Sequence, residues 1–516
     1  MTHSLTNAPV LVVGAGIMGA GIAQVAAQVG HAVQLFDMRD GAAAQAKAKL
    51  AATFDGLVAK GRIDASAAQA ALARIEPISA LAQAASVRLV VEAIVENLDA
   101  KRGLFKELEA LVAEDCVLAT NTSSISVTAI AHGLRRPGRV VGMHFFNPVP
   151  LMKLVEVVSG LNTDAPAAAA VFDLATAWGK TPVHAKSTPG FIVNRIARPY
   201  YAETLALLLE QAAAPEVIDA CLRGAGFRMG PCELMDLIGH DTNFAVTQSV
   251  FEANFFDKRY QPSGVQREMV DGGRLGRKSG RGFYRYPDGA PPLPAAPTDA
   301  PANAPANALE VTVHGGGAIA DWLEHGAARA MAAYGKHPAR LYASGWTGIE
   351  VARARLVLTD GRMAQDVAQL MNLADITVFD RPLALPSSLA VSAGTALAYA
   401  VAPSASPAWR GQSAAWLAAL GVAPQAVADT PGLVAARTVA MLVNEAADAV
   451  LHGVCTPDGA DAAMKLGVNY PAGPFEWLAG WGAADIVALL DALDAHHRGE
   501  RYRVSPWLRR QIASKA

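Results

Sequence analysis

A glycine-rich turn near the N-terminus is the first feature of the sequence that could do chemistry. Val10-Leu11-Val12-Val13-Gly14-Ala15-Gly16-Ile17-Met18-Gly19 is typical of a strand that runs into G-x-G-x-x-G and then a helix. Gly14 allows the tight turn, Gly16 lets a pyrophosphate approach the backbone, and Gly19 lets helix and strand pack closely. The helix N-terminus adds unpaired N–H groups and a partial positive charge. The turn, with Ile17 and Met18, is a predicted dinucleotide site; a plain α/β turn is the alternative.

Asp37 bears on the same site, because it ends the next predicted strand, Val33-Gln34-Leu35-Phe36-Asp37. A carboxylate there accepts hydrogen bonds from the hydroxyls of an adenosine ribose and repels a 2′-phosphate, so it favours NAD over NADP. Arg39 lies nearby and could weaken that preference. FAD shares the glycine fingerprint, so the motif by itself leaves NAD and FAD open.

A second group of chemically capable residues lies between residues 121 and 194. It comprises four segments: Asn121-Thr122-Ser123-Ser124, Gly142-Met143-His144-Phe145-Phe146-Asn147-Pro148, Leu154-Val155-Glu156 and Pro189-Gly190-Phe191-Ile192-Val193-Asn194-Arg195. His144 ends an apolar strand, where open α/β sheets bind ligands. A histidine taken alone is more often structural than catalytic. A His and an Asn beside aromatic residues are nevertheless unusual for a core, so this is a candidate chemical site.

Short apolar runs alternate with helical stretches in the first part of the chain, and these elements must position both groups. The predicted strands are Val10–Val13, Ala32–Phe36, Leu89–Val91, Val117–Ala119, Val140–His144 and Leu154–Val158, and Met18–Val29 is a predicted helix. Strands that alternate with helices predict a parallel sheet covered on both faces. From about Pro189 the pattern changes to long apolar helices such as Phe191–Gln211, which predicts a second, all-α domain.

The second half of the chain repeats the first. Trp178-Gly179-Lys180-Thr181-Pro182, ending at Thr188-Pro189-Gly190, matches Leu420-Gly421-Val422-Ala423-Pro424, ending at Thr430-Pro431-Gly432, at a constant spacing of 242 residues. A Pro- and Ala-rich stretch, Ala290–Ala308, predicts a linker, and a new strand at Leu309–Val313 precedes Gly315-Gly316-Gly317. Two halves, each an α/β domain followed by a helical domain, explain this better than chance similarity.

Composition limits the function classes. The 516 residues suggest roughly three or four structural units, and 52% hydrophobic with 17% charged residues is a globular profile. A net charge of −2 offers no reason to expect nucleic acid or an anionic membrane as partner. The four scattered cysteines have no metal-ligand spacing, and neither a signal-peptide layout nor an unbroken apolar span is present. We expect a soluble, cytoplasmic protein without a metal.

Six motifs in order resemble the L-3-hydroxyacyl-CoA dehydrogenase family: GAGIMGAGIAQ, VEAIVEN, NTSS, GMHFFNPVPLMKLVEVV, TPGFIVNR and GRKSGRGFY. The resemblance covers residues ~8–286 and implies NAD as the cofactor. It implies a long bacterial form with a duplicated C-terminal half. The expected parts are a Rossmann-type NAD domain (1–187), an all-α C-terminal domain (188–288), a linker (289–308), a degenerate Rossmann-like domain (309–428) and a second helical domain (429–516).

The resemblance also implies roles for four residues. His144 would be the general base that takes the proton from the C3 hydroxyl of an L-3-hydroxyacyl-CoA while hydride leaves C3 for the nicotinamide. Glu156 would hydrogen-bond the far nitrogen of His144 and fix its tautomer. Ser123 and Asn194 would hold the substrate. The alternatives are that Ser123 caps the helix near Ser126, Glu156 is a surface carboxylate and Asn194 is an ordinary helix residue.

Further cofactor and substrate contacts are expected on weaker grounds. Glu96 and Lys101 would lie close to the nicotinamide and its ribose, although a surface ion pair is the alternative. Asn147 and Lys278 are further expected cofactor contacts. Lys60, in Lys60-Gly61-Arg62, would contact the adenosine part of CoA, with a solvated basic turn as the alternative.

The second half is predicted to have lost the chemistry. At the same spacing, Asn194 corresponds to Ala436, and HFFNP corresponds to Ala398-Tyr399-Ala400-Val401-Ala402-Pro403, which has no histidine. We expect one active site per chain, with the second helical domain in the place of a dimer partner and homo-oligomers as a further option.

The expected activity is reversible NAD-linked oxidation of a short or dicarboxylic substrate such as 3-hydroxybutyryl- or 3-hydroxyadipyl-CoA. By resemblance, this belongs to β-oxidation and other fatty acid metabolism, or to phenylacetate catabolism. The alternatives are a hydroxy-acid or sugar-acid dehydrogenase that does not use CoA, and an inactive NAD-binding structural protein.

Overall fold

The computed structural model describes residues 5–292, 310–332, 335–383 and 395–513. These residues pack into two compact units, of which one holds Met1–Arg195 with Ala449–Val468 and the other Ile196–Asp448 with Asn469–Ala516. Most of the predicted linker, residues 293–308, lies outside the described residues. None of the helices in the described ranges is long and apolar enough to cross a membrane.

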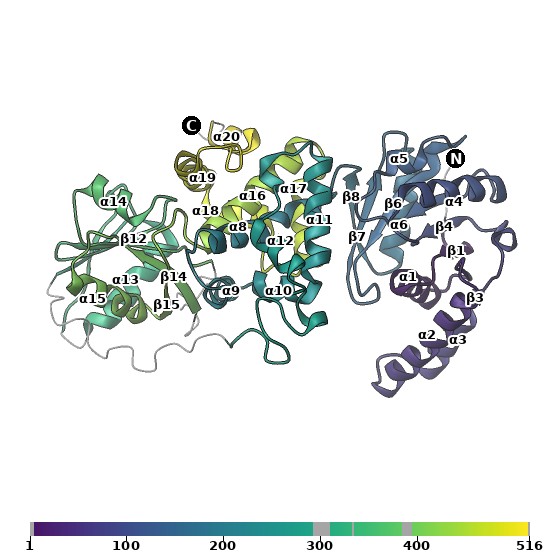
Figure 1. The fold of residues 1–516 in the computed structure, drawn as a ribbon, viewed down its shortest axis with the longest axis horizontal. Helices are drawn as coiled ribbons and strands as arrows, with labels where there is room; N and C mark the ends of the chain where they lie inside the picture. The colour runs from purple at the N-terminus through teal and green to yellow at the C-terminus, as the bar shows by residue number, and fades with distance from the viewer. Residues whose placement is uncertain (1–4, 293–309, 333–334, 384–394, 514–516) are drawn as a thin grey trace. The chain divides into compact units, whose positions relative to one another are not determined.

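The first unit contains an eight-stranded sheet in the order β3-β2-β1-β4-β5-β6-β7-β8 (Figure 1). The predicted strands are confirmed to within two residues at each end, because each is a short, buried apolar run. The strands are β1 (Val10–Val13), β2 (Val33–Phe36), β3 (Ile75–Pro77), β4 (Leu89–Glu92), β5 (Val117–Thr120), β6 (Val140–Phe145), β7 (Leu154–Ser159) and β8 (Thr181–Lys186).

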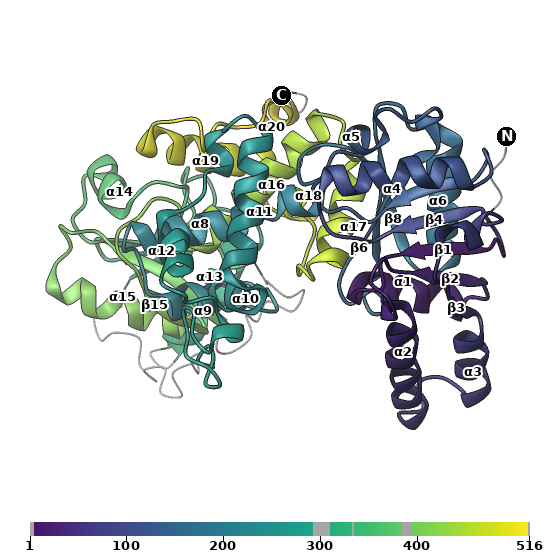
Figure 2. The same cartoon turned by 45° about the vertical axis from the view of Figure 1, so that its right-hand side comes forward.

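Helices cover this sheet, as the alternating pattern predicted. Residues of α1 and α6 share one hydrophobic core with alternate residues of the strands, and α4 crosses the sheet in Figure 2. A helical hairpin of α2 and α3 projects from the sheet in the same view. The helices are α1 (Ile17–Gln28), α2 (Ala42–Ala59), α3 (Ala65–Ala73), α4 (Leu98–Leu111), α5 (Val127–Ala131), α6 (Ala165–Ala177) and α7 (Val193–Ile196), with short 3₁₀ turns at Leu81–Ala84 and Pro137–Arg139.

The prediction of an all-parallel sheet is wrong at one edge. Strand β7 runs antiparallel to β6, and β8 runs parallel to β7, so the last two strands are reversed. Residues 146–153, which join β6 to β7, are too few for the crossover that a parallel neighbour requires. The reversal pairs His144 directly with Glu156 across the two strands.

The second unit begins with the first helical repeat. The predicted long helix Phe191–Gln211 is instead broken into α7 and α8 (Arg198–Leu209), because Pro199 lacks the N–H that would continue the ladder. The remaining elements of this repeat are α9 (Pro215–Gly224), α10 (Pro231–Ile238), α11 (His240–Ala253) and α12 (Gly264–Asp271), with 3₁₀ turns at Lys258–Tyr260 and Arg277–Ser279.

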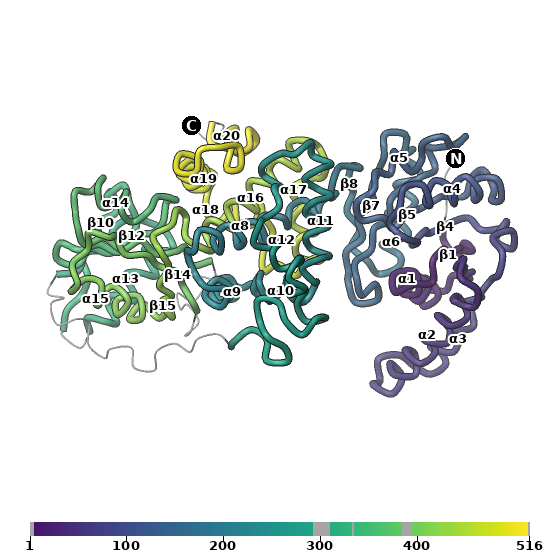
Figure 3. The backbone as a smooth tube through the Cα atoms, viewed as in Figure 1, coloured from purple at the N-terminus to yellow at the C-terminus, as the bar shows by residue number. Residues whose placement is uncertain are grey.

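A seven-stranded sheet, β10-β9-β11-β12-β13-β14-β15, forms the second α/β part. Its core includes residues of α13 and α15, which lie beside the strands in Figure 3. The elements are β9 (Val311–His314), α13 (Gly317–Ala332), β10 (Ala339–Leu341), β11 (Gly348–Val351), β12 (Ala354–Leu358), α14 (Ala364–Met371), β13 (Ile376–Phe379), β14 (Thr395–Val401), α15 (Pro407–Ala419) and β15 (Val422–Ala426).

Strand order corrects the predicted counterpart of the HFFNP segment. Strand β14 is antiparallel to β13 and parallel to β15, as β7 is to β6 and β8, so Ala398–Pro403 corresponds to β7 rather than to the histidine strand. The counterpart of β6 is β13. Asp380, directly after β13, donates its N–H to the carbonyl of Ala398 (2.9 Å) and therefore occupies the level of His144.

The glycine turn of the second sheet lacks the features that surround the first. The N–H of Gly315 bonds to the carbonyl of Leu341, as that of Gly14 bonds to Phe36, so Tyr342 stands where the first half has Asp37. The neighbour β11 is antiparallel, so its amino end meets the turn and places Trp346 in a stack on His314 (ring centroids 4.2 Å apart). This position therefore has a phenol in place of the carboxylate of Asp37.

The second helical repeat consists of α16 (Ala435–Leu451), α17 (Pro457–Gly467), α18 (Pro474–Trp481), α19 (Ala483–His497) and α20 (Pro506–Ala513). The two repeats exchange their second helices. Helix α9 of the first repeat packs on β14 of the second sheet, and α17 of the second repeat packs on β7 and β8 of the first sheet. This exchange explains why Ala449–Val468 belongs to the first unit.

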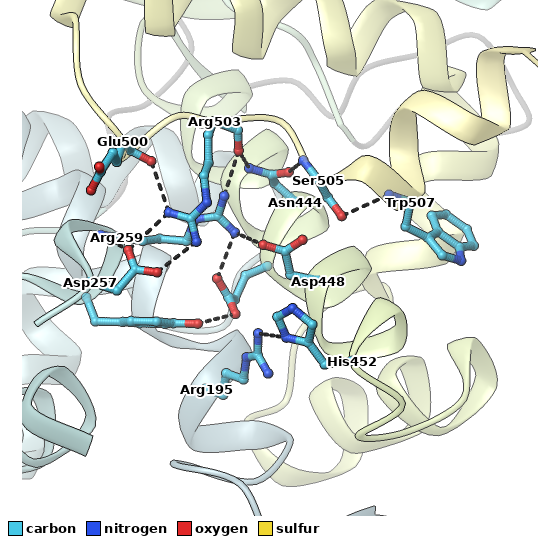
Figure 4. A network of polar contacts seen from close by, with 12 residues as sticks. Arg195, Asp257, Arg259, Asn444, Asp448, His452, Glu500, Arg503, Ser505 and Trp507 are labelled. Carbon is cyan, nitrogen blue, oxygen red and sulfur yellow. Dashed lines mark hydrogen bonds and ion pairs between the residues drawn. The ribbon is translucent and has the colours of Figure 1, made fainter. Parts of the chain in front are cut away.

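Reciprocal buried contacts join the two repeats within the second unit. Arg259 (3.3 Å) and the Tyr260 hydroxyl (2.6 Å) bind the Glu445 carboxylate. At a spacing of 242 residues, Arg501 (2.9 Å) and the Tyr502 hydroxyl (3.0 Å) bind Glu203. Figure 4 shows Arg259 at the centre of the first set, together with Asp448 and Arg503. Such self-complementary contacts are those of a two-fold dimer, formed here inside one chain.

The first prediction concerns Glu203, which is fully buried. Burial raises its pKa, but Arg501 and Arg437 outweigh that effect and hold the pKa at about 2. We expect Glu203→Gln to lower the free energy of unfolding of the helical unit by about 3–5 kcal/mol at pH 7, because two guanidinium groups lose their carboxylate. Chemical denaturation of the full chain measures this.

The acid dependence supplies the check on this prediction. Because the folded pKa lies below the ordinary value of 4.5, the contribution of Glu203 is complete above that pH and is lost as pH falls toward 2. The difference between wild type and Glu203→Gln should shrink over this range. Arg267→Gln, which breaks an exposed pair with Asp271, is the control and should cost less than about 0.5 kcal/mol. Equal stability of the two variants contradicts the prediction.

Candidate active site

The centre of the candidate site is a histidine–carboxylate pair at the end of β6. Nδ1 of His144 lies 2.5 Å from Oε2 of Glu156, and the two residues are register partners in β6 and β7. Both side chains are buried. Since a carboxylate accepts, Nδ1 carries the hydrogen, and Nε2 keeps the lone pair that can take a proton.

The second oxygen of Glu156 anchors a backbone turn. Oε1 accepts the N–H groups of Ile192 and Val193, each at 3.0 Å. These two residues begin the helix that carries Asn194, so one carboxylate orients the imidazole and fixes the neighbouring helix start. With three hydrogen bonds, this buried charge is well satisfied. The surface-carboxylate alternative for Glu156 is wrong.

A cavity of about 340 Å³ opens beside the pair. Nδ2 of Asn194 donates to the Ser123 carbonyl (3.4 Å) at its edge, and Phe146 and Phe191 pack against the His144 ring. Eight of the residues identified by sequence line it or belong to the pair: Met18, Glu96, Lys101, Ser123, His144, Asn147, Asn194 and Glu156.

Ser123 does not cap the following helix, so that alternative is wrong. Ser126 is the N-cap of α5, and its hydroxyl accepts the N–H of Ala129 (3.2 Å). Ser123 instead lies against Glu96, whose Oε1 accepts the Ser123 N–H at 2.9 Å. Its hydroxyl lies 3.4 Å from the same Glu96 oxygen, beside the cavity, and is not committed to a helix end.

Lys101 is buried rather than on the surface, which rules out the simple surface ion pair. Its ammonium bonds to Glu92 (2.6 Å) and lies 3.2 Å from Glu96. Burial alone would raise the pKa of Glu96, but Lys101 and the Thr122 hydroxyl hold it below its ordinary value. Glu96 therefore presents a negative charge at the cavity wall.

Sequence reasoning missed two residues that hold this wall in place. Glu92, fully buried, binds the Thr120 hydroxyl (2.6 Å) as well as Lys101. Oδ1 of Asn121 accepts the N–H of Phe145 (2.9 Å), next to His144. The sequence signal that could have identified them is a carboxylate or an amide at the end of an apolar strand, because a polar group there needs a partner.

The glycine turn has the close contacts that its sequence implies. A Cβ at Gly14 would lie 2.4 Å from the Ala93 carbonyl oxygen, and one at Gly19 would lie 1.8 Å from that of Gly14. Nothing stands within 4 Å of the Cβ direction of Gly16, so a phosphate has room there. Gly14, Gly16, Asp37 and Arg39 line a cavity of about 980 Å³ that continues to Leu104 and Leu111. These residues fit an extended dinucleotide.

Two neighbours fix the carboxylate of Asp37 at the edge of this cavity. Its carboxylate accepts the Ala15 N–H (2.8 Å) and pairs with Arg39 at 3.0 Å. The hydrogen bond from Arg39 is the main reason why the pKa of Asp37 is lowered to about 2. Arg39, itself exposed, is folded onto the carboxylate rather than extended toward the place of a 2′-phosphate.

Lys60 lines neither of these cavities, and the other predicted contact, Lys278, belongs to the second unit. Lys60 ends α2 on the projecting hairpin and is exposed. Lys278, in the second unit, pairs with Asp241 (2.5 Å). Their roles toward CoA and cofactor stay predictions, as do the domain boundaries and the exposed Ile17 in the glycine turn.

The second prediction concerns cofactor choice. We expect Asp37→Ala to reduce the preference for NAD over NADP by about tenfold or more, because the variant loses the ribose acceptor and frees Arg39 to meet a 2′-phosphate. The dissociation constants of both dinucleotides, measured by calorimetry, give the ratio. Arg39→Ala is the matched control and should keep the preference for NAD. An unchanged ratio in Asp37→Ala contradicts this account of the carboxylate.

Comparison with known proteins places these features in a family. Residues 9–188 match the family described as "3-hydroxyacyl-CoA dehydrogenase, NAD binding domain". The C-terminal domain of the same family matches twice, at residues 190–286 and 432–516. Between them, residues 356–431 match the "3-hydroxybutyryl-CoA dehydrogenase reduced Rossmann-fold domain". The repeat read from the sequence is thereby confirmed.

Individual relatives match over the whole chain or its first half. The 3-hydroxyadipyl-CoA dehydrogenase of Escherichia coli K12 is 42% identical over 97% of both chains. The human mitochondrial hydroxyacyl-coenzyme A dehydrogenase is 41% identical over 54% of this chain and 90% of its own. A crystal structure of 3-hydroxybutyryl-CoA dehydrogenase from E. coli K12 superposes with a TM-score of 0.86 at 40% identity, covering 98% of each chain.

These matches agree with the glycine turn, the cavity beside the histidine–carboxylate pair and the duplicated helical repeat. The chain belongs to the 3-hydroxyacyl-CoA dehydrogenase family and is an NAD-dependent dehydrogenase with one complete and one reduced half.

Proposed function

We propose that the chain oxidises the 3-hydroxyl of a short-chain or dicarboxylic L-3-hydroxyacyl-CoA, and that His144 is its general base. The observation that carries this is the 2.5 Å contact between Nδ1 of His144 and Oε2 of Glu156 beside the cavity that Ser123 and Asn194 line. The substrates named for full-length and half-length relatives, 3-hydroxyadipyl- and 3-hydroxybutyryl-CoA, support the substrate class.

In the proposed step, Nε2 of His144 takes the proton from the hydroxyl as the C3–H bond breaks. Bound NAD supplies the hydride acceptor at its nicotinamide. Glu156 stabilises the positive charge that then develops on the imidazole, and its buried position strengthens that interaction. Ser123 and Asn194 hold the substrate so that its hydroxyl faces Nε2.

We further propose one active site per chain. In the second half, Asp380 replaces the histidine, Ala398 replaces Glu156 and Tyr342 replaces Asp37. The second helical repeat would then act as an internal dimer partner, as its reciprocal contacts with the first repeat suggest. Further oligomerisation and a cytoplasmic location stay predictions, as does a role in fatty acid or phenylacetate breakdown.

Two other functions remain to be separated from this one. A dehydrogenase of free hydroxy acids or sugar acids would use the same base but not CoA. An inactive NAD-binding protein would have no use for a buried histidine–carboxylate pair at a cavity. The pair therefore favours an active enzyme.

The third prediction tests the base and the substrate together. We expect NAD reduction with 3-hydroxybutyryl-CoA and 3-hydroxyadipyl-CoA, but not with the free acids. In His144→Gln, kcat should fall about 10²- to 10⁴-fold with little change in NAD affinity, because glutamine cannot take the proton. Initial rates by absorbance give both results. Undiminished turnover in this variant would rule out the proposed base.

The fourth prediction compares the two buried carboxylates. Glu156→Gln should lower kcat about 10²- to 10⁴-fold, because an amide that donates to Nδ1 forces the wrong imidazole tautomer. Asp380→Asn should leave kcat unchanged and cost about 1–3 kcal/mol of stability, since it loses only a backbone acceptor. Steady-state kinetics and thermal unfolding of both variants separate the effects. A large loss of kcat in Asp380→Asn would contradict the assignment of one active site.

A further inference from the structure

A segment of the second helical repeat lies behind the catalytic strands. Within the first unit, the Lys186 N–H at the end of β8 donates to the Val454 carbonyl (2.9 Å), and α17 packs on β7 and β8. A Cβ at Gly467 would lie 2.7 Å from Leu154 and 3.0 Å from Val193. The strand of Glu156 and the turn before Asn194 thus rest on residues contributed by the other repeat.

His452, which precedes α17, contacts the residue next to Asn194. Its Nδ1 lies 3.1 Å from a terminal nitrogen of Arg195, as Figure 4 shows. Arg195 is buried, whereas His452 is exposed to solvent. The Arg195 N–H also donates to the Gly190 carbonyl (3.1 Å), so Arg195 closes the turn that Glu156 holds from the other side.

The inactive half supplies an internal comparison. At the spacing of 242 residues, Arg195 corresponds to Arg437 and His452 corresponds to Glu210. Arg437 forms two 2.9 Å contacts with the Glu210 carboxylate. Arg437 also contacts the Glu203 carboxylate at 2.8 Å. The position of His452 is therefore taken by a permanent anion in the half without a histidine base, and by an imidazole in the half that has one.

We propose that His452 is a positioning residue for the active site: through Arg195 it holds the turn that carries Asn194, and protonation releases this hold. The inference rests on the proposed function, because its effect is measured as a change in the turnover of a 3-hydroxyacyl-CoA.

The physical basis is the change in what Nδ1 can do. A neutral imidazole accepts a hydrogen bond from the guanidinium, whereas an imidazolium has only donors and repels the cation 3.1 Å away. Solvent reaches His452, so protons can exchange with its ring.

The charged and titratable groups around His452 come from four elements. Those that face it or its segment are Arg195 on α7, Lys186 on β8, Glu156 on β7, Cys455 after α16, and Asp448 one turn earlier on α16. Burial raises the pKa of the Cys455 thiol to about 12, so it stays neutral.

The experiment compares full-length wild type with His452→Gln and His452→Glu between pH 5 and pH 8. The glutamine variant keeps a neutral acceptor for the Arg195 guanidinium, and the glutamate variant places there the anion that Glu210 provides in the other half. We expect kcat/KM of each variant to match wild type at pH 8 and to exceed it about tenfold at pH 5, the effect of one charge-assisted hydrogen bond. Any effect of pH on the rest of the site is common to all three proteins and cancels in the ratio of variant to wild type. For the control His132→Gln, at another exposed histidine, the ratio of its kcat/KM to that of wild type should not change with pH.

If wild type is active and the ratio of kcat/KM between each His452 variant and wild type does not change from pH 8 to pH 5, the inference is overturned and the proposed function stays intact. A wild type that oxidises no 3-hydroxyacyl-CoA overturns the proposed function instead. In that case the contact is still tested by thermal unfolding. The midpoint of His452→Glu should rise relative to wild type as pH falls from 8 to 5, and an unchanged difference counts against the contact.

Discussion

The buried carboxylate of Glu156 is the interaction on which the site depends. One oxygen meets Nδ1 of His144, and the other meets the N–H groups of Ile192 and Val193. A charge without water must be satisfied by hydrogen bonds, so the imidazole and the turn before Asn194 are both drawn to fixed positions. The geometry of the proposed base and that of the residue proposed to hold the substrate therefore both depend on this one carboxylate.

That carboxylate reaches His144 only because β7 runs against the direction of its neighbours. In an antiparallel pair, opposed residues lie side by side on one face, so His144 and Glu156 become neighbours although twelve positions apart. The edge formed by β7 and β8 is in turn covered by α17 from the other repeat. The second half is thus part of the support for the first half's chemistry.

The reduced half shows which of these features folding itself requires. Asp380 accepts the N–H groups of Val434, Ala435 and Ala436, the counterparts of Ile192, Val193 and Asn194. A carboxylate at this helix start is kept, although it now comes from the strand equivalent to β6. The histidine is absent at this position, so Asp380 shares with Glu156 the contact to the helix start but not the contact to an imidazole.

Local patterns in the sequence by themselves determined six strands of the first sheet, the glycine turn with Asp37, the motifs around His144 and the repeat. Apolar runs and backbone-specific glycines act over short distances. Tertiary structure alone decided the reversal of β7, the burial of Lys101 against Glu92, and the exchange of α9 and α17. It also assigned Asp380 to the place of His144 and brought His452 to Arg195. These contacts join residues far apart in the chain, and their partners are chosen by packing and by the satisfaction of buried charges, which no local pattern records.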